Sequence, residues 1–210
     1  RLSDHKIYVK LSKAKFFLTK VAYIGLGFTE GGTYILDHRK KAIDDWPRPT
    51  GDSDRTRSRM QPGQRGRAHD AKVGIRSFLG VTGFFRKYIK DYAKISKPLT
   101  DLLQQDQVFR WGEEQENSFV ALKSAITTAP LLITPDPTAP KVVIPDASEH
   151  AIGGVLLQQT DEGWKPCAYI SYKLHDNQKH PKWSPYEIEL YAMVRCLQCW
   201  RHWLVGTTFT

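Results

Sequence analysis

The sequence has little cysteine and methionine, and it has no long apolar run. Its three cysteines, Cys167, Cys196 and Cys199, are too few for a disulfide framework and are typical of a reducing compartment. No stretch approaches the roughly 18 apolar residues that cross a bilayer, and the first residues lack the apolar core of a signal peptide. We therefore expect an intracellular protein that is not secreted and has no membrane partner. The only methionines are Met60 and Met193, so we expect the chain to begin inside a longer reading frame or after a cleavage.

Cys196 and Cys199 have the CxxC spacing that occurs in zinc and redox sites. The sequence offers no second CxxC and no nearby HxxxH to complete a zinc site. Both residues also fall inside a helical pattern, and free cysteine is among the most buried residue types. We therefore interpret the pair as ordinary core packing.

Acidic residues are scarce in the first half of the chain. Residues 1–100 hold 22 Lys and Arg against 9 Asp and Glu, a net charge of +13, whereas residues 101–210 hold 9 against 13, a net charge of −4. With 40% hydrophobic residues and six Trp the chain is globular, and the uneven charge indicates two parts with different partners. A cationic half suits a phosphate backbone, because binding releases condensed counterions. Solubilising surface charge is the alternative, although it explains scattered charge better than this asymmetry.

The segment 51–74 has a composition unlike the rest of the chain. It carries five Arg and one Lys, and almost nothing apolar beyond Met60 and Val73. Such a segment cannot bury enough apolar surface to offset the entropy of ordering it. The sequence therefore predicts a disordered basic insertion, which could hold RNA electrostatically or could simply be solvated.

Aromatic and basic residues alternate between the two sides of a predicted helix over 76–92. Five apolar residues recur at helical spacing, which predicts that they are buried. Basic residues occupy the other side and are free to meet a nucleic-acid backbone. The buried set is Phe78, Phe85, Tyr88, Ile89 and Tyr92, and the basic set is Arg86, Lys87 and Lys90.

The second half predicts a β-meander between two amphipathic helices. The first helix covers 112–128, and the second begins at Ser184, where Pro185 and Glu187 complete a capping box, and runs to about Leu204. We expect the second helix to bury Tyr186, Leu190, Met193, Leu197, Trp200 and Leu204. The strands are predicted at 141–144, 154–158 and 167–171, with a turn at 161–163.

Two carboxylates are candidates for catalysis. Asp146 follows the strand at 142–144, where a strand end can present a side chain to a cleft, although Asp is also a common turn residue. Glu189 lies beside Tyr186 and Met193 at the edge of the predicted buried face of its helix. A carboxylate at such a position needs a partner, and a divalent cation shared with Asp146 would provide one. Acidic side chains that hold two metal ions about 4 Å apart are typical of phosphodiester-cleaving sites.

Several short motifs occur along the chain in a fixed order. Each motif alone is weak evidence for a family, but the ordered set is specific. Together the motifs resemble the pol polyprotein of Ty3/gypsy-type long-terminal-repeat retrotransposons, from the reverse transcriptase thumb into ribonuclease H. The resemblance covers nearly the whole chain except 51–74. The motifs are Val21-Ala-Tyr-Ile-Gly25, Ala42-Ile-Asp-Asp-Trp-Pro-Arg-Pro-Thr50, Arg76-Ser-Phe-Leu-Gly80, Phe84-Phe-Arg-Lys-Tyr-Ile89, Pro98-Leu-Thr-Asp-Leu-Leu103, Phe109-Arg-Trp111, Leu122-Lys123 through Ala129-Pro130, Asp146-Ala-Ser148 with Ile152-Gly153, Ala168-Tyr-Ile-Ser171 with Lys173-Leu174, and Trp200-Arg-His-Trp-Leu204.

The resemblance implies roles for individual residues. Asp146 matches the first metal-binding Asp of ribonuclease H, and Glu189 matches the Glu on the first long helix. Gly25 falls in the segment that resembles the primer grip. The implied cofactor of the intact parent is Mg²⁺, and the implied partners are an RNA–DNA hybrid or duplex nucleic acid and the rest of the polyprotein. Thumb residues Arg86, Lys87 and Lys90 would contact the duplex backbone without reading sequence.

The chain also departs from the family pattern. The polymerase palm with its paired Asp motif would lie before residue 1, and the third and fourth ribonuclease H carboxylates would follow residue 210. Pro145 stands where the family usually has Thr, and Leu26 replaces the usual His. The insertion at 51–74 separates two motifs that the family joins by a few residues.

The resulting expectation is an α+β fold in which a helical thumb and connection segment precedes a partial ribonuclease H-like mixed sheet with packed helices. We expect a palm edge and thumb start over 1–50, the disordered basic insertion over 51–74, thumb and connection helices over 75–108, and a truncated ribonuclease H-like domain over 109–210. The intact parent would copy RNA into DNA and cleave RNA in hybrids, whereas this fragment is expected to be inactive. The alternative is a non-catalytic nucleic-acid-binding protein derived from the element.

Overall fold

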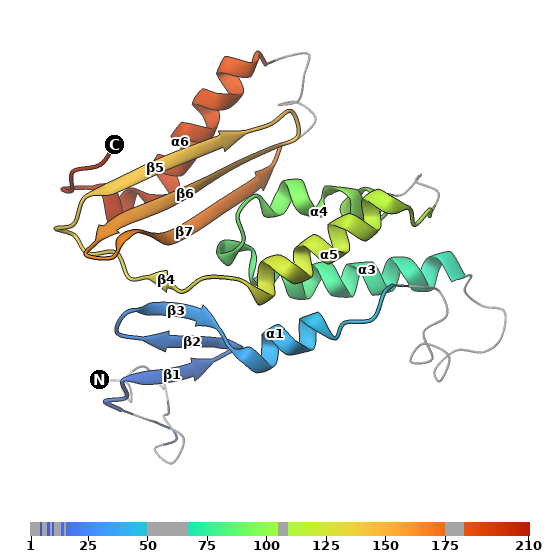
Figure 1. The fold of residues 1–210 in the computed structure, drawn as a ribbon, viewed down its shortest axis with the longest axis horizontal. Coiled ribbons are helices and arrows are strands. Elements are labelled where there is room, and N and C mark those ends of the chain that lie inside the picture. Colours follow the sequence, from blue (N-terminus) through green and yellow to red (C-terminus); the bar gives the residue numbers. More distant parts are fainter. Residues whose placement is uncertain are drawn as a thin grey trace.

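The computed structural model describes residues 5, 8, 10, 14, 16–49, 67–104, 109–174 and 183–210. Figure 1 shows two antiparallel sheets, one above the other in the view, with a group of helices beside them. No helix in these ranges is long and apolar enough to cross a membrane.

The first sheet is a meander that one distant strand completes. Strands β1 and β2 are joined by the two residues Ile24 and Gly25, both of which have positive φ, 49° and 83°. This is the backbone twist that two-residue hairpin turns require. At Gly32 a Cβ would lie 2.1 Å from the carbonyl oxygen of Leu132, so only glycine lets β4 approach β3. The order is β1–β2–β3–β4, formed by Lys20–Tyr23, Leu26–Thr29, Gly32–Ile35 and Leu132–Ile133.

The helices of the first half share one core with this sheet. The buried aromatic set predicted from the sequence lies in this core, with Phe78, Phe85, Tyr88 and Ile89 at most 3% exposed and Tyr92 packed against them. The predicted single helix over 76–92 is wrong, because the chain leaves the α-helix after Phe84 and starts a new one at Tyr92. The elements are α1 (Asp37–Asp44), α3 (Arg67–Phe84), the 3₁₀ helix η3 (Arg86–Tyr88), α4 (Tyr92–Asp101) and α5 (Glu113–Thr127).

The predicted disordered segment 51–74 is wrong over its last part. Helix α3 begins at Arg67, so 67–74 is helical. The reason is that Ala71 and Ile75 are buried, at 1% and 0% exposure, which gives this basic segment an apolar face that composition alone hides. Residues 51–66 lie outside the described ranges, so the rest of that prediction is untested.

The second sheet is a three-stranded meander with a short parallel addition at its edge. Strands β5 (Lys141–Ala147), β6 (Ala151–Thr160) and β7 (Gly163–Lys173) pair in that order. At the outer edge of β5, the N–H of Val143 donates to the carbonyl of Thr210 at 2.8 Å, and the N–H of Thr210 donates to the carbonyl of Lys141 at 3.1 Å. This isolated parallel bridge lies outside the named strands, which all pair antiparallel. The predicted α+β class is confirmed, with antiparallel sheets where a mixed sheet was expected.

Helix α6 (Pro185–Leu204) covers one face of this sheet but does not bury the residues predicted from its apolar stripe. Tyr186, Leu190 and Met193 are 82%, 61% and 46% exposed, so the predicted inner face is wrong for these three and right for Trp200 and Leu204. The reason lies in the strand below, where a Cβ on Gly154 would lie 2.4 Å from the Cys196 sulfur. The close approach brings the row through Cys196 against the sheet and turns Tyr186, Leu190 and Met193 away from it. The buried row is Ile188, Ala192, Cys196, Trp200 and Leu204.

Candidate active site and nucleic-acid interface

Asp146 lies within a strand, not in a turn. It pairs with Gly153 of β6, and the turn begins only at Ser148, whose hydroxyl donates to the carbonyl of Ala151 at 2.9 Å. The interpretation of Asp146 as a turn residue is therefore wrong. Pro145 is tolerated beside it because the N–H groups of Lys141 and Val143 point to the outer edge of β5. The same alternation places the proline nitrogen at that edge, so no hydrogen bond to β6 is lost.

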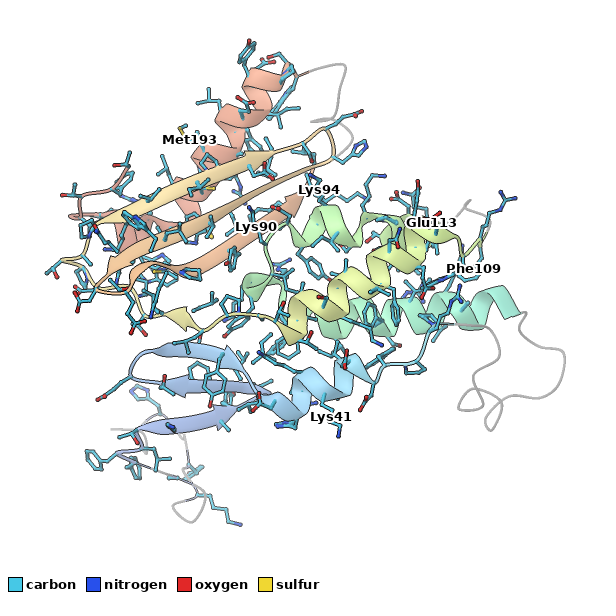
Figure 2. The ribbon with its side chains drawn as sticks, viewed as in Figure 1. Lys41, Lys90, Lys94, Phe109, Glu113 and Met193 are labelled. Atoms are coloured by element: carbon cyan, nitrogen blue, oxygen red, sulfur yellow. The ribbon has the colours of Figure 1, made fainter. Side chains whose placement is uncertain are left out.

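Asp146 and Glu189 line one cavity of about 370 Å³ between β5 and α6. Tyr186, Leu190 and Met193 form its apolar side, and Met193 is labelled on α6 in Figure 2. Glu189 is exposed, so the expectation that it sits at the edge of a buried face and needs a partner is wrong. Both carboxylates are instead open to solvent within one hollow, which is accessible to a cation or to a phosphate-bearing ligand.

A third carboxylate approaches Asp146 from the other core. Asp91 begins α4 with left-handed backbone, φ 56° and ψ 31°, a conformation that Asp tolerates better than most residues. Burial, reinforced by repulsion from Asp146, raises the pKa of the Asp91 carboxyl above its usual value. A Cβ on Gly153 would lie 3.0 Å from the Asp91 Oδ1 atom, so this side chain reaches the sheet where β6 carries a glycine opposite Asp146.

The described residues do not form a complete metal site. Within the ranges that the structure covers, no group of three or more His, Cys, Asp or Glu side chains is arranged to hold a metal ion. Asp146 and Glu189 are the two carboxylates that line the cavity, and Asp91 is not among its lining residues. Two exposed carboxylates are a poor anchor for the pair of cations that phosphodiester cleavage uses.

The predicted basic residues of the nucleic-acid interface lie together on one short segment. Arg86 and Lys87 are in η3 and Lys90 follows it, and all three are exposed while the residues between them are buried. Figure 2 shows Lys90 and Lys94 between the β5–β7 sheet and α4, whereas Lys41 lies on α1 at the other side of the helices. The segment therefore presents several cations beside the carboxylates of Asp91 and Asp146.

Gly25 lies apart from this group. It occupies the β1–β2 turn of the first sheet, where its carbonyl accepts from the N–H of Leu36 at 3.1 Å. A Cβ there would lie 3.0 Å from two atoms of the Arg39 side chain, and φ is +83°. The turn is thus fixed against the start of α1, while its neighbours Tyr23 and Ile24 stay 64% and 59% exposed.

Two features of the site were missed from the sequence. Asp91 has no local signal, because its contact with Asp146 joins residues 55 positions apart. The second is a cavity beside β7 that Trp203 and His202 line together with η3. The motif containing Trp203 marked this helix end in the sequence, but no spacing rule linked it to Arg86 and Lys87.

One family model matches the second half of the chain. Residues 111–210 match the family described as the RNase H-like domain found in reverse transcriptase. Over its full length the chain is 31% identical to the Retrovirus-related Pol polyprotein from transposon 297 of Drosophila melanogaster, of which it covers 17%. It is also 31% identical, over 98% of its length, to the corresponding polyprotein from transposon opus, of which it covers 19%. The chain thus spans about a fifth of the length of these curated relatives.

Solved structures share the fold. The foamy viral protease-reverse transcriptase in complex with RNA/DNA hybrid aligns with 95% of this chain and 24% of its own at a TM-score of 0.64 and 23% identity. The same enzyme in complex with dsDNA aligns with 95% of this chain and 37% of its own at the same TM-score and identity. At this identity the likeness establishes the α+β arrangement of both sheets and their helices.

Proposed function

Because residues 111–210 match an RNase H-like domain found in reverse transcriptase, we propose that the chain is a piece of a Pol polyprotein that joins the thumb and connection of a reverse transcriptase to the first part of its ribonuclease H-like domain. The parent would synthesise DNA on RNA and cleave the RNA of the resulting hybrid. The ordered motifs and the similarity to the two Drosophila polyproteins support a Ty3/gypsy-type parent. The proposed divisions are 1–50, 51–66, 67–108 and 109–210, with the third beginning at the start of α3.

The observation that carries this proposal is the shared cavity of Asp146 and Glu189. Asp146 comes from strand β5 and Glu189 comes from helix α6. Strands β6 and β7 separate the two residues in the sequence. The pairing of these two carboxylates in one accessible hollow supports a phosphodiester substrate.

Mg²⁺ belongs to the parent enzyme in this proposal. Asp146 and Glu189 would be two of its ligands, and the cation would supply charge stabilisation at a phosphate. The described residues alone do not complete that site. We therefore expect this chain by itself to bind nucleic acid without cleaving it.

A ribonuclease assay tests the catalytic part. The chain is incubated with a labelled RNA–DNA hybrid and Mg²⁺, and the variant Asp146→Asn is assayed in parallel. The matched control is Asp161→Asn, which changes an exposed carboxylate in the β6–β7 turn. We expect all three proteins to give the same background. Cleavage by the chain and by Asp161→Asn that Asp146→Asn abolishes would show that the two-carboxylate site is sufficient, and it would overturn the expectation of inactivity.

The alternative function, a non-catalytic nucleic-acid-binding protein, is favoured by the exposed Arg86, Lys87 and Lys90. These side chains project from a segment whose other members are anchored in the core, with Tyr88 donating to the Thr33 hydroxyl at 2.9 Å. Because the buried residues hold this segment in place, its exposed cations could contact a phosphate backbone without any preference for a nucleotide sequence. The same interface serves both candidate functions.

Salt dependence of hybrid binding tests the interface. Each phosphate contact that is lost lowers the slope of log K against log salt by about 0.9 for a duplex. We expect Lys90→Ala to lower the slope by about one contact. Lys41→Ala removes the same charge from α1 and is expected to leave the slope unchanged. Equal slopes for the parent, Lys90→Ala and Lys41→Ala would show that Lys90 makes no phosphate contact in the complex.

A further inference from the structure

A second cavity lies where the two cores meet, at the free edge of β7. It has a volume of about 290 Å³ and is formed by η3, by residues 168–172 of β7 and by the last turns of α6. It shares no lining residue with the cavity of Asp146 and Glu189. Among the described strands β7 pairs only with β6, and η3 packs against β7.

The formal charge of this second cavity has one sign. Arg86 and Lys87 line it together with His202, and no Asp or Glu does. Arg195 adds a further cation beside it, with its guanidinium 5.0 Å from the centre of the Tyr172 ring. Arg86, Lys87 and His202 are all exposed, and the Lys87 ammonium lies 5.6 Å from the centre of the Tyr88 ring.

The walls of the second cavity are aromatic. Tyr169 and Tyr172 come from β7, and Trp203 comes from α6, where its ring lies 4.4 Å from that of His202. Flat aromatic walls beside cations are the combination that holds an unpaired base together with its phosphate, because every base has a face to stack. The volume is at the lower end of ligand cavities, which start at roughly 300 Å³, and a duplex does not fit in it.

We propose that the second cavity binds a single unpaired nucleotide, with the phosphate at Arg86 and Lys87 and the base against the aromatic walls. This inference rests on the proposed function in one respect: the proposed duplex interface would bring a nucleic-acid strand close to the second cavity. The nucleotide could be free or could belong to a strand that leaves the duplex interface at η3. A site of this kind would hold a strand end while Lys90 and its neighbours hold the duplex.

Binding of three probes to the full chain tests this inference. The probes are adenosine 5′-monophosphate, a blunt RNA–DNA hybrid, and the same hybrid with a single-stranded overhang. The variants are Lys87→Gln and His202→Ala, with His38→Ala on α1 as a matched control, because all three side chains are exposed. Thermal unfolding of each variant is measured alongside, so that a change in binding is separated from a change in folding.

We expect Lys87→Gln and His202→Ala to weaken binding of the overhang hybrid roughly tenfold relative to the parent, the effect of one charge-assisted hydrogen bond. The preference for the overhang over the blunt hybrid should disappear in His202→Ala and persist in His38→Ala. Saturable binding of the mononucleotide, weakened by the same variants, identifies a free nucleotide as sufficient. Binding of the overhang alone identifies a strand nucleotide.

Two outcomes would overturn the inference. The first is that parent and His202→Ala bind overhang and blunt hybrids equally. The second is that Lys87→Gln and His202→Ala bind the overhang hybrid as tightly as His38→Ala does. If only the blunt hybrid fails to bind the parent chain, the result counts against the proposed duplex interface. Binding of adenosine 5′-monophosphate then still decides whether the second cavity is a nucleotide site.

Discussion

Replacing Gly154 by alanine tests the packing that places Glu189 and Asp146 in one cavity. Gly154 lies in β6 directly under α6, and an alanine Cβ there would lie 2.4 Å from the Cys196 sulfur. It would also lie 3.3 Å from the carbonyl oxygen of Ile144. Because Cys196 is 0% exposed, the sulfur has no solvent-filled space to move into.

The magnitude follows from this contact. A separation of 2.4 Å is about 1 Å shorter than the roughly 3.5–4.0 Å at which nonbonded heavy atoms attract. Adding a methyl group to a filled core costs about 1–3 kcal/mol. For a chain of this length, 1 kcal/mol lowers Tm by about 2–4 °C, so we expect Gly154→Ala to lower Tm by roughly 2–12 °C.

Urea and thermal unfolding of four proteins measure the effect: the parent, Gly154→Ala, Cys196→Ala and the double variant. Cys196→Ala removes the sulfur that the new methyl group meets, so Gly154→Ala should cost less than about 0.5 kcal/mol in that background. The two sites should therefore couple by about 0.5–3 kcal/mol. Gly80→Ala is the control, because a Cβ on Gly80 of α3 meets nothing within 4 Å. Its higher helix propensity should stabilise the protein by up to about 1 kcal/mol.

An equal cost of Gly154→Ala with and without the Cys196 sulfur would refute this reasoning. So would the absence of any cost. In either case α6 would not contact β6 at this register, and the cavity shared by Asp146 and Glu189 would not exist as described.

Two further predictions concern α6 and the buried thiols. Ser184→Ala removes the hydroxyl that accepts from the N–H of Glu187. Urea titrations should show a free energy of unfolding lower by about 1 kcal/mol for this variant, whereas Ser184→Asn should retain most of the stability that the N-cap contributes. Burial raises the pKa of Cys167 and of Cys196 to about 11, so mass spectrometry should find both unmodified by iodoacetamide at pH 8 in the folded chain while Cys199 reacts. Because these folded pKa values exceed those of the unfolded chain, the neutral thiols stabilise fully below about pH 8.5, and this stability is lost as the pH rises toward 11. Rapid loss of all three thiols at pH 8, or constant stability over that range, would contradict the burial.

Local rules predicted the elements well where neighbours in the sequence provide the signal. The capping box at Ser184 is present as predicted, with Glu187 reaching back to the Ser184 N–H at 2.6 Å. Helix α5 differs from its predicted bounds by one residue at each end. These features depend on hydrogen bonds and periodicity within a few residues.

Prediction failed where the partner lies far along the chain. Tyr186, Leu190 and Met193 were expected inside, but the close approach of α6 to Gly154 turns the row that contains Ala192 and Cys196 toward the sheet. The start of α3 was missed because Ala71 and Ile75 are buried by contacts that a basic composition conceals. Periodicity identifies an apolar stripe, but it does not say which stripe the partner surface accepts.

By itself the sequence determined the α+β class, and it predicted Asp146 and Glu189 as candidate carboxylates and Arg86, Lys87 and Lys90 as candidate cations. Only the tertiary structure decided that the two carboxylates share one cavity and that Asp91 reaches Asp146 from the other core. It also decided that the cations of η3 meet β7 and α6 around a second, aromatic cavity. The physical reason is that residue type and spacing determine local hydrogen bonding, whereas burial, close approach and the meeting of charges depend on which distant surfaces pack together.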